Sequence, residues 1–120
     1  MKKVISFTIW GDREHFLLGA LLNADIAEKD WPGWICRYYI DETTVPELFI
    51  NELESRSNTE LVFMKEGAGQ FATLWRFYAA GDSEIDFVIF RDIDSRLGVR
   101  EKAAVDEWIN SGKDFHIIRD

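Results

Sequence analysis

Two aspartates one residue apart, Asp92 and Asp94, have the residue types and spacing that most favour chemistry in this chain. They directly follow the apolar run 87–90, and parallel sheets bind ligands at the carboxyl ends of their strands. Carboxylates suit Mg²⁺ or Mn²⁺ better than zinc, and two of them leave coordination positions for phosphate oxygens. Arg91 and Arg96 flank the pair, as a metal-bridged diphosphate requires. The segment therefore predicts a divalent-metal site that binds a diphosphate.

Two other interpretations of this triplet compete with the metal site. Asp-x-Asp also occurs in solvated turns, where a carboxylate bonds only to nearby backbone. Phosphatases that form an aspartyl-phosphate use a similar triplet, but by family pattern it follows their first strand. Here it follows the fourth predicted strand, which argues against a phosphatase.

A second motif, Gly67-x-Gly69-x-x-Ala72, matches the dinucleotide-binding fingerprint in outline. It follows a predicted strand, opens a predicted helix and precedes an acid, Asp92, at the next strand end. Glu66 places a carboxylate just before the turn, and the strand is the third rather than the first. The alternatives are a dinucleotide-binding Rossmann domain of an oxidoreductase and a glycine-rich loop that only turns.

Five β-branched and aromatic runs predict strands, at residues 4–10, 34–40, 61–64, 87–90 and 115–118. Helical periodicity separates them, most clearly in the apolar positions Leu17, Ala20, Leu21, Ala24 and Ala27. Alternation of strands and helices predicts a mostly parallel sheet with right-handed crossovers. We therefore expect an α/β fold of one domain over residues 1–120, a Rossmann-like three-layer α/β/α sandwich.

Local signals predict where the helices begin and end. Thr44 and Glu47 have capping-box spacing, which predicts a helix start at Thr44. Gly81 and Gly112 suit the left-handed position that ends a helix. The helix before Gly81 is expected to bury one face, made of Phe71, Leu74, Trp75 and Tyr78.

Composition limits the classes of protein that this chain can represent. Its 120 residues include 14 Lys and Arg against 22 Asp and Glu, a formal net charge of −8, which argues against a basic nucleic-acid-binding face. No apolar run approaches the roughly 20 residues of a membrane span. Cys36 is the only cysteine, so no internal disulfide or cysteine-based zinc cluster can form. We expect a soluble, cytoplasmic domain.

Nearly the whole chain resembles the N-terminal, nucleotide-sugar-binding half of a GT-A-type glycosyltransferase, and more narrowly a group of small bacterial and viral glycosyltransferase-like proteins. The matching stretches are, in chain order, 9–11, Gly19 with Asn23, 31–34 with Arg37, Tyr39 and Asp41, 75–77, 91–96, 100–108 and 116–120. The resemblance implies a nucleoside-diphosphate sugar as donor, Mn²⁺ or Mg²⁺ as cofactor, and an acceptor glycan or protein that the sequence does not identify.

The resemblance also implies roles for single residues. Asp94 would ligate the metal directly, and Asp92 would contact the metal or the donor ribose. Arg76, on the helix before that strand, would reach the donor. The remaining nucleotide contacts would come from the ends of the first two strands, at Thr8, Trp10, Gly11, Asp12 and Asp41.

Structural roles compete with several of these assignments. Trp10 could belong to the core, and Arg76 could form a surface pair with Asp82 or Glu84. Arg37, in mid-strand, could form a structural ion pair. Two further residues, Gly19 and Asn23, favour packing and capping over ligand contact.

Length is the main departure from the resemblance. Enzymes of this type continue into a segment that supplies the acceptor site and often a further metal ligand. We therefore expect the chain to lack the acceptor-binding half, and a partner chain or a second copy could supply it. A non-catalytic nucleotide-binding module is the third open class.

Overall fold

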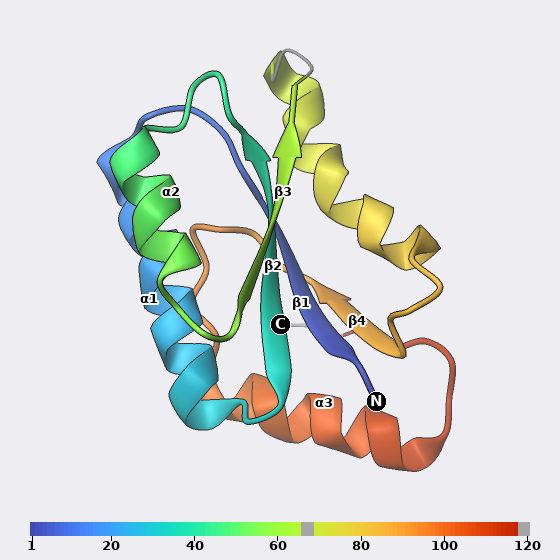
Figure 1. The fold of residues 1–120 in the computed structure, drawn as a ribbon. Coiled ribbons are helices and arrows are strands. Elements are labelled where there is room, and N and C mark those ends of the chain that lie inside the picture. The colour runs from blue at the N-terminus through green and yellow to red at the C-terminus, as the bar shows by residue number, and fades with distance from the viewer. Residues whose placement is uncertain (66–68, 118–120) are drawn as a thin grey trace.

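Four parallel strands form a single sheet in the computed structural model, which describes residues 1–65 and 69–117 (Figure 1). The sheet order is β3-β2-β1-β4. The strands are β1 (Lys3–Ile9), β2 (Trp34–Asp41), β3 (Thr59–Met64) and β4 (Phe87–Phe90). The helices between and after them are α1 (Glu14–Asp30), α2 (Glu47–Glu54), the 3₁₀ helix η1 (Gly69–Gly81) and α3 (Val99–Ser111). The expected alternation and parallel, Rossmann-like topology are confirmed.

Helices cover both faces of the sheet because side chains alternate along each strand. In β1, Ile5, Phe7 and Ile9 belong to the core shared with α1, α2 and α3. The opposite face packs on η1 through a second cluster, made of Tyr39, Ala72, Trp75 and Ala79. In α1, the predicted inward positions are buried, with Leu21 only partly so.

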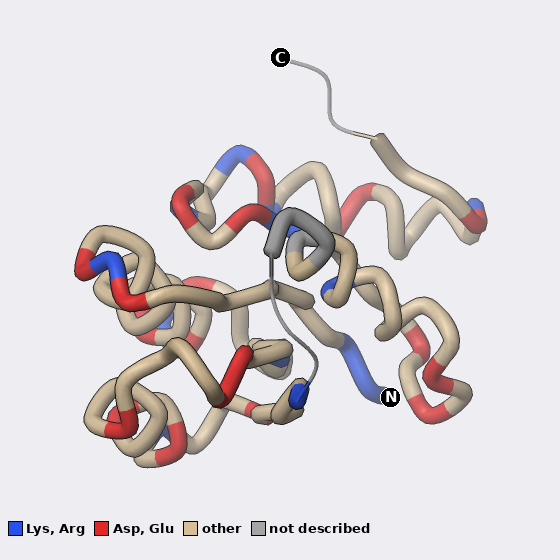
Figure 2. The backbone as a smooth tube through the Cα atoms, turned by 90° about the horizontal axis from the view of Figure 1, so that it is seen from above, with Lys and Arg blue, Asp and Glu red and all other residues tan. Residues whose placement is uncertain are grey.

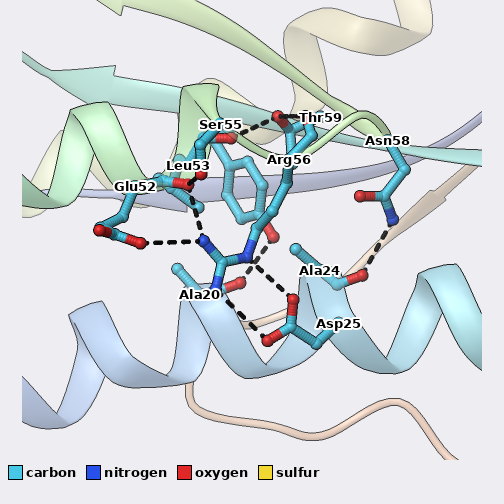
Figure 3. A network of polar contacts seen from close by, with 10 residues as sticks. Ala20, Ala24, Asp25, Glu52, Leu53, Ser55, Arg56, Asn58 and Thr59 are labelled. Atoms are coloured by element: carbon cyan, nitrogen blue, oxygen red, sulfur yellow. Dashed lines mark hydrogen bonds and ion pairs between the residues drawn. The ribbon is translucent and has the colours of Figure 1, made fainter.

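Polar contacts join the helices to one another and to the sheet (Figure 3). Arg56, after α2, pairs with Asp25 of α1 at 2.9 Å and with Glu52 of α2 at 3.4 Å. The Tyr38 hydroxyl donates to the Ala20 carbonyl at 2.8 Å, and Asn58 Nδ2 donates to the Ala24 carbonyl at 2.9 Å. These contacts fix α1 and α2 relative to the sheet.

Arg37 forms a structural ion pair, which was the predicted alternative to a ligand contact. Its guanidinium bonds Glu60 and Asp82, each at 2.9 Å, and Lys2 pairs with Glu60 at 2.7 Å. Burial alone raises the pKa of Glu60, but hydrogen bonds from Lys2 and Arg37 outweigh it and lower that pKa. The network links β2 and β3 to the residue before β1 and to the residue after η1.

The predicted fifth strand is wrong for the residues that the structure describes. Residues 115–117 pair with no strand, and Ile118 lies outside the described residues. Trp108 of α3 holds the chain just before this segment, because its Nε1 donates to the Lys113 carbonyl at 2.8 Å. The His116 ring stacks on Trp108 at 5.8 Å. These contacts keep the segment against α3 and away from pairing with β4.

The predicted helix boundaries are partly wrong. Pro46 is the N-cap of α2 and no side chain caps it, because the Thr44 hydroxyl bonds elsewhere. Gly112 has the expected left-handed φ of 72°, whereas Gly81 does not have a positive φ. The expected buried face of η1 is only partly confirmed: Trp75 is buried, Leu74 and Tyr78 are exposed, and the Phe71 side chain lies outside what the structure describes.

No helix in the described part of the chain is long and apolar enough to cross a membrane. Along the described backbone, the positions of lysines and arginines are scattered among those of acidic residues (Figure 2).

Candidate functional site

The sheet order identifies where a ligand is expected to bind. The chain runs from β1 outward through β2 to β3, then crosses back to place β4 on the other side of β1. Ligands of open α/β sheets bind at such a reversal, outside the carboxyl ends of the two strands. Here the strand ends lead into Trp10 and Asp12 after β1 and into Asp92 and Asp94 after β4, so these predicted ligand-binding residues border the same point.

Helix α1 holds the aspartate loop, residues 91–97. The Asn23 side chain donates to the Ser95 carbonyl at 2.8 Å and accepts from the Leu97 N–H at 3.1 Å. A Cβ at Gly19 would lie 2.8 Å from the Ile93 carbonyl oxygen, so only glycine permits this approach. The packing role expected of Gly19 and Asn23 is confirmed.

Asp92 and Asp94 lie exposed on this fixed loop. The Asp92 carboxylate is 63% exposed and pairs with Arg76 at 2.5 Å. Arg96 Nη1 donates weakly to the Asp94 carbonyl oxygen at 3.4 Å. Arg91, expected beside a diphosphate, instead pairs with Glu101 of α3 at 2.9 Å.

Arg76 lies on η1, and its side chain reaches Asp92 at the carboxyl edge of the sheet. The alternative pairing with Asp82 or Glu84 is wrong, because its ion-pair partner is Asp92 and Asp82 binds Arg37. Its guanidinium also lies 5.0 Å from the Phe77 ring. Its Nε is buried and has no hydrogen-bond partner among the described residues. The side chain therefore has unused donor capacity beside an exposed carboxylate.

Two hydroxyls of β1 hold the backbone of Arg76, and we call Ser6 and Thr8 the hydroxyl clamp. Thr8 Oγ1 accepts from the Arg76 N–H at 3.0 Å, and Ser6 Oγ donates to the Arg76 carbonyl at 2.7 Å. Both residues are buried. These two bonds attach the backbone of η1 at Arg76 directly to β1. Thr8, predicted to contact the nucleotide, acts in this structure on Arg76.

Ser6 was missed by the sequence analysis, although a signal for it existed. Ser6 and Thr8 are two hydroxyls at i and i+2 in an otherwise apolar strand, so they face the same side of the sheet. Buried hydroxyls require hydrogen-bond partners, and here the partner is the backbone of η1.

The end of β2 holds the end of β1. Asp41 is fully buried, and its carboxylate accepts from the Thr43 N–H at 3.1 Å and from the Thr44 hydroxyl at 2.9 Å. Thr44 Oγ1 in turn accepts from the Gly11 N–H at 2.7 Å. Gly11 has φ +84°, a conformation that favours glycine. These bonds favour a positioning role for Asp41, whose predicted contact with base or ribose stays a prediction.

The positioned turn presents Trp10 and Asp12 outward. Trp10 is 41% exposed, so its alternative placement in the core is wrong. An exposed indole at a strand end offers a flat apolar surface, which suits stacking against a base. Asp12 is exposed beside it. Both residues remain available for the nucleotide contacts that were predicted for them.

The glycine motif is only partly visible. Gly67 lies outside the described residues, Gly69 begins η1, and Ala72 is fully buried against the sheet. The small residue at position 72 is thus explained by helix–sheet packing.

The side chains at the site could supply only part of the coordination of a divalent cation. No group of three or more potential ligands is assembled in the described residues. Asp92 and Asp94 offer two carboxylates, so the other ligands of Mg²⁺ or Mn²⁺ would be water and ligand phosphates, an arrangement usual for Mg²⁺. His116, stacked on Trp108, belongs to another part of the molecule.

No protein-family model, curated protein or solved structure matches this chain. The geometry at the β1–β4 reversal is therefore the basis for a functional proposal.

Proposed function

We propose that this chain is the donor-binding half of a metal-dependent, GT-A-type glycosyltransferase. It binds a nucleoside-diphosphate sugar, with Mn²⁺ or Mg²⁺ held by Asp92 and Asp94, for transfer of the sugar to an acceptor. The observation that carries the proposal is the Arg76–Asp92 ion pair at the β1–β4 reversal, 2.5 Å long and formed by an exposed carboxylate. An arginine and an exposed carboxylate thus lie together at the edge where ligands of open α/β sheets bind, which supports the proposal.

Charge explains why both side chains are needed. The chain carries a net charge of −8, which opposes a dianionic donor. Arg76 offers planar N–H donors that match phosphate oxygens, and its Nε has no partner among the described residues. Asp92 and Asp94 offer oxygen ligands for the cation that neutralises the rest of the diphosphate charge.

The reaction breaks the bond between the sugar anomeric carbon and the β-phosphate oxygen. Both electrons of that bond stay on the oxygen, so negative charge grows on the leaving nucleoside diphosphate. When bound, a divalent ion acts as a Lewis acid toward this charge. Arg76 adds hydrogen bonds to the same phosphate, and these bonds strengthen as the charge develops. The acceptor hydroxyl oxygen forms the new bond to the anomeric carbon, and its proton passes to water.

Arg76 changes partner in this scheme. In the structure it neutralises Asp92, and the hydroxyl clamp fixes its backbone. If Asp92 held a cation, the Arg76 guanidinium would be released from Asp92 and could bind a phosphate oxygen. Nucleotide and metal should therefore bind cooperatively. The metal neutralises the Asp92 carboxylate, which repels the nucleotide, and the nucleotide neutralises the Arg76 guanidinium, which repels the metal.

A nucleotide panel tests the class of ligand. Calorimetry with UDP, GDP and NAD, each with Mn²⁺ and with EDTA, should show one nucleoside diphosphate that binds only with metal. NAD binding that EDTA does not change would support the dinucleotide alternative. Metal-dependent binding of a nucleoside diphosphate that the corresponding nucleoside-diphosphate sugar does not displace would support a non-catalytic nucleotide-binding module.

A further inference from the structure

A groove of about 510 Å³ runs along the free edge of β4, and of the aspartate loop only Arg91 lines it. We call it the edge groove. Its floor is β4, and η1 and α3 flank it through Ala79 and Val105. Residues 114–116, which follow α3, form its outer wall. The groove plays no part in the proposed function.

Unpaired backbone groups of β4 in the edge groove favour binding of an extended peptide segment. Phe87 and Arg91 donate their N–H groups to Lys2 and Ser6, the first just before β1 and the second in it. Because N–H groups alternate in direction along a strand, Val88 and Phe90 point theirs to the free edge. β4 pairs only with β1 in the described part of the chain. Unpaired donors and acceptors at a sheet edge are completed by another strand.

The outer wall has the properties of such a strand. Phe115 and Ile117 alternate with His116 and are 89% and 77% exposed. Sequence predicts a strand over 115–118, yet the described residues of this segment pair with nothing. Two unpaired strand-forming surfaces therefore lie at one edge of the molecule.

Handedness prevents the segment from pairing with its own β4 in the usual way. Helix α3 packs on the same face as α1, through Val105 and Trp108. The chain moves from β1 to β2 in one direction, and a strand beyond β4 would lie in the other. A parallel strand there, reached through α3 on this face, would need a left-handed crossover, which folds avoid.

We propose that the edge groove binds the Phe115–Ile117 segment of a second copy of this chain. The exchange is reciprocal. Residues 115–117 of each copy lie between β4 of the other copy and the same segment of that other copy, which forms its outer wall. The strand order across the pair is then β4, partner segment, own segment, partner β4, which makes one continuous sheet about a two-fold axis. Two β4 strands cannot pair directly, because each lies inside its own groove walls.

The interface is short, so a weak and concentration-dependent dimer is expected. Sedimentation of the whole chain should show monomer at low micromolar concentration and dimer near millimolar concentration. Phe115→Asp should weaken dimerisation at least tenfold. Leu48→Asp is the matched control, because Leu48 is a similarly exposed residue on α2, 78% exposed, away from the groove.

Amide exchange of the unmodified chain gives a second readout that needs no variant. The Val88 and Phe90 amides should become protected as concentration rises, whereas Ile89, already facing β1, should change little. A chain that stays monomeric at millimolar concentration would overturn the proposal. So would a dimer that survives Phe115→Asp, or one lost on Leu48→Asp, which would place the contact on α2. Because nucleotide binding is not used, these outcomes are independent of the proposed function.

Discussion

The Arg76 N–H donates to the Thr8 hydroxyl at 3.0 Å, so the strand that ends at the site also holds the arginine of the site. Ser6 bonds the carbonyl of the same residue at 2.7 Å. The Arg76 side chain is then left to pair with Asp92. The Arg76 guanidinium thus comes from η1 and the Asp92 carboxylate from the aspartate loop, and β1 holds the backbone of Arg76 in place.

Replacing Arg76 should separate its two roles. Arg76→Gln should weaken nucleoside diphosphate binding by about 10- to 100-fold, since a hydrogen bond to a charged group contributes about 1.5–3 kcal/mol. It should not weaken binding of Mn²⁺ alone, because Asp92 loses its competing partner. Calorimetric titrations of both ligands measure this. Arg56→Gln, which removes an ion pair on the helical layer, is the control and should change neither affinity.

Loss of the hydroxyl clamp should act through Arg76. Thr8→Val keeps the side-chain shape but leaves the Arg76 N–H without its acceptor, at a cost of about 1–3 kcal/mol in unfolding free energy. Nucleotide affinity should fall in parallel, and Thr8→Ser should restore most of both quantities. Chemical denaturation and calorimetry provide the two values. Equal nucleotide affinity in Thr8→Val and the unmodified chain would argue against the clamp.

Glycine 19 should be indispensable to the aspartate loop. In Gly19→Ala the new methyl group would lie 2.8 Å from the Ile93 carbonyl oxygen, so the loop or helix must move. Overpacking of this kind costs about 1–3 kcal/mol, and metal-dependent binding should fall with it. Gly81→Ala provides the comparison, because nothing lies within 4 Å of a Cβ there. Thermal melts should show a large loss only at position 19.

The Arg37 network should make stability depend on acid pH. The pKa of Glu60 is below its ordinary 4.5, and that of Asp82 is below 3.8, through the Glu84 backbone N–H and then Arg37. Carboxylates with lowered pKa values stabilise the fold above their unfolded-state pKa, and that contribution is lost as pH falls through the folded-state pKa.

Melting temperatures from pH 6 to pH 3 test this dependence. The unmodified chain should lose stability below about pH 4.5, and Arg37→Gln should be less stable at pH 6 but show a smaller decrease on acidification. Arg56→Gln, whose partners are more exposed, should leave the slope unchanged. A slope that is the same in all three chains would contradict the assigned role of Arg37.

Regular periodicity explains which parts of the fold were predictable. The strands at 4–10, 34–40, 61–64 and 87–90 and the buried face of α1 follow from local patterns, and all are confirmed within a few residues. Local patterns failed where distant side chains compete. Thr44 has capping-box spacing, but its hydroxyl bonds Gly11 and Asp41, so α2 begins at Glu47 instead.

The site was predictable in position but not in its connections. Asp92 and Asp94 follow an apolar strand, so their place at the carboxyl edge could be inferred from the sequence. The Ser6–Arg76 bond joins residues that are 70 positions apart, and no local pattern contains it. The same holds for the Asn23 bonds to the aspartate loop, 72 and 74 positions away.

Metal dependence of nucleotide binding decides whether Asp92 and Asp94 hold a metal ion that binds the donor. Nucleoside diphosphate should be titrated with Mn²⁺ into the unmodified chain, into Asp94→Asn and into Asp114→Asn, whose exposed carboxylate lies away from the aspartate loop. We predict tight binding by the unmodified chain and by Asp114→Asn. The affinity for nucleoside diphosphate should fall by about 100-fold or more in Asp94→Asn and with EDTA. Binding that is equal in all three chains, or unchanged by EDTA, would contradict this prediction.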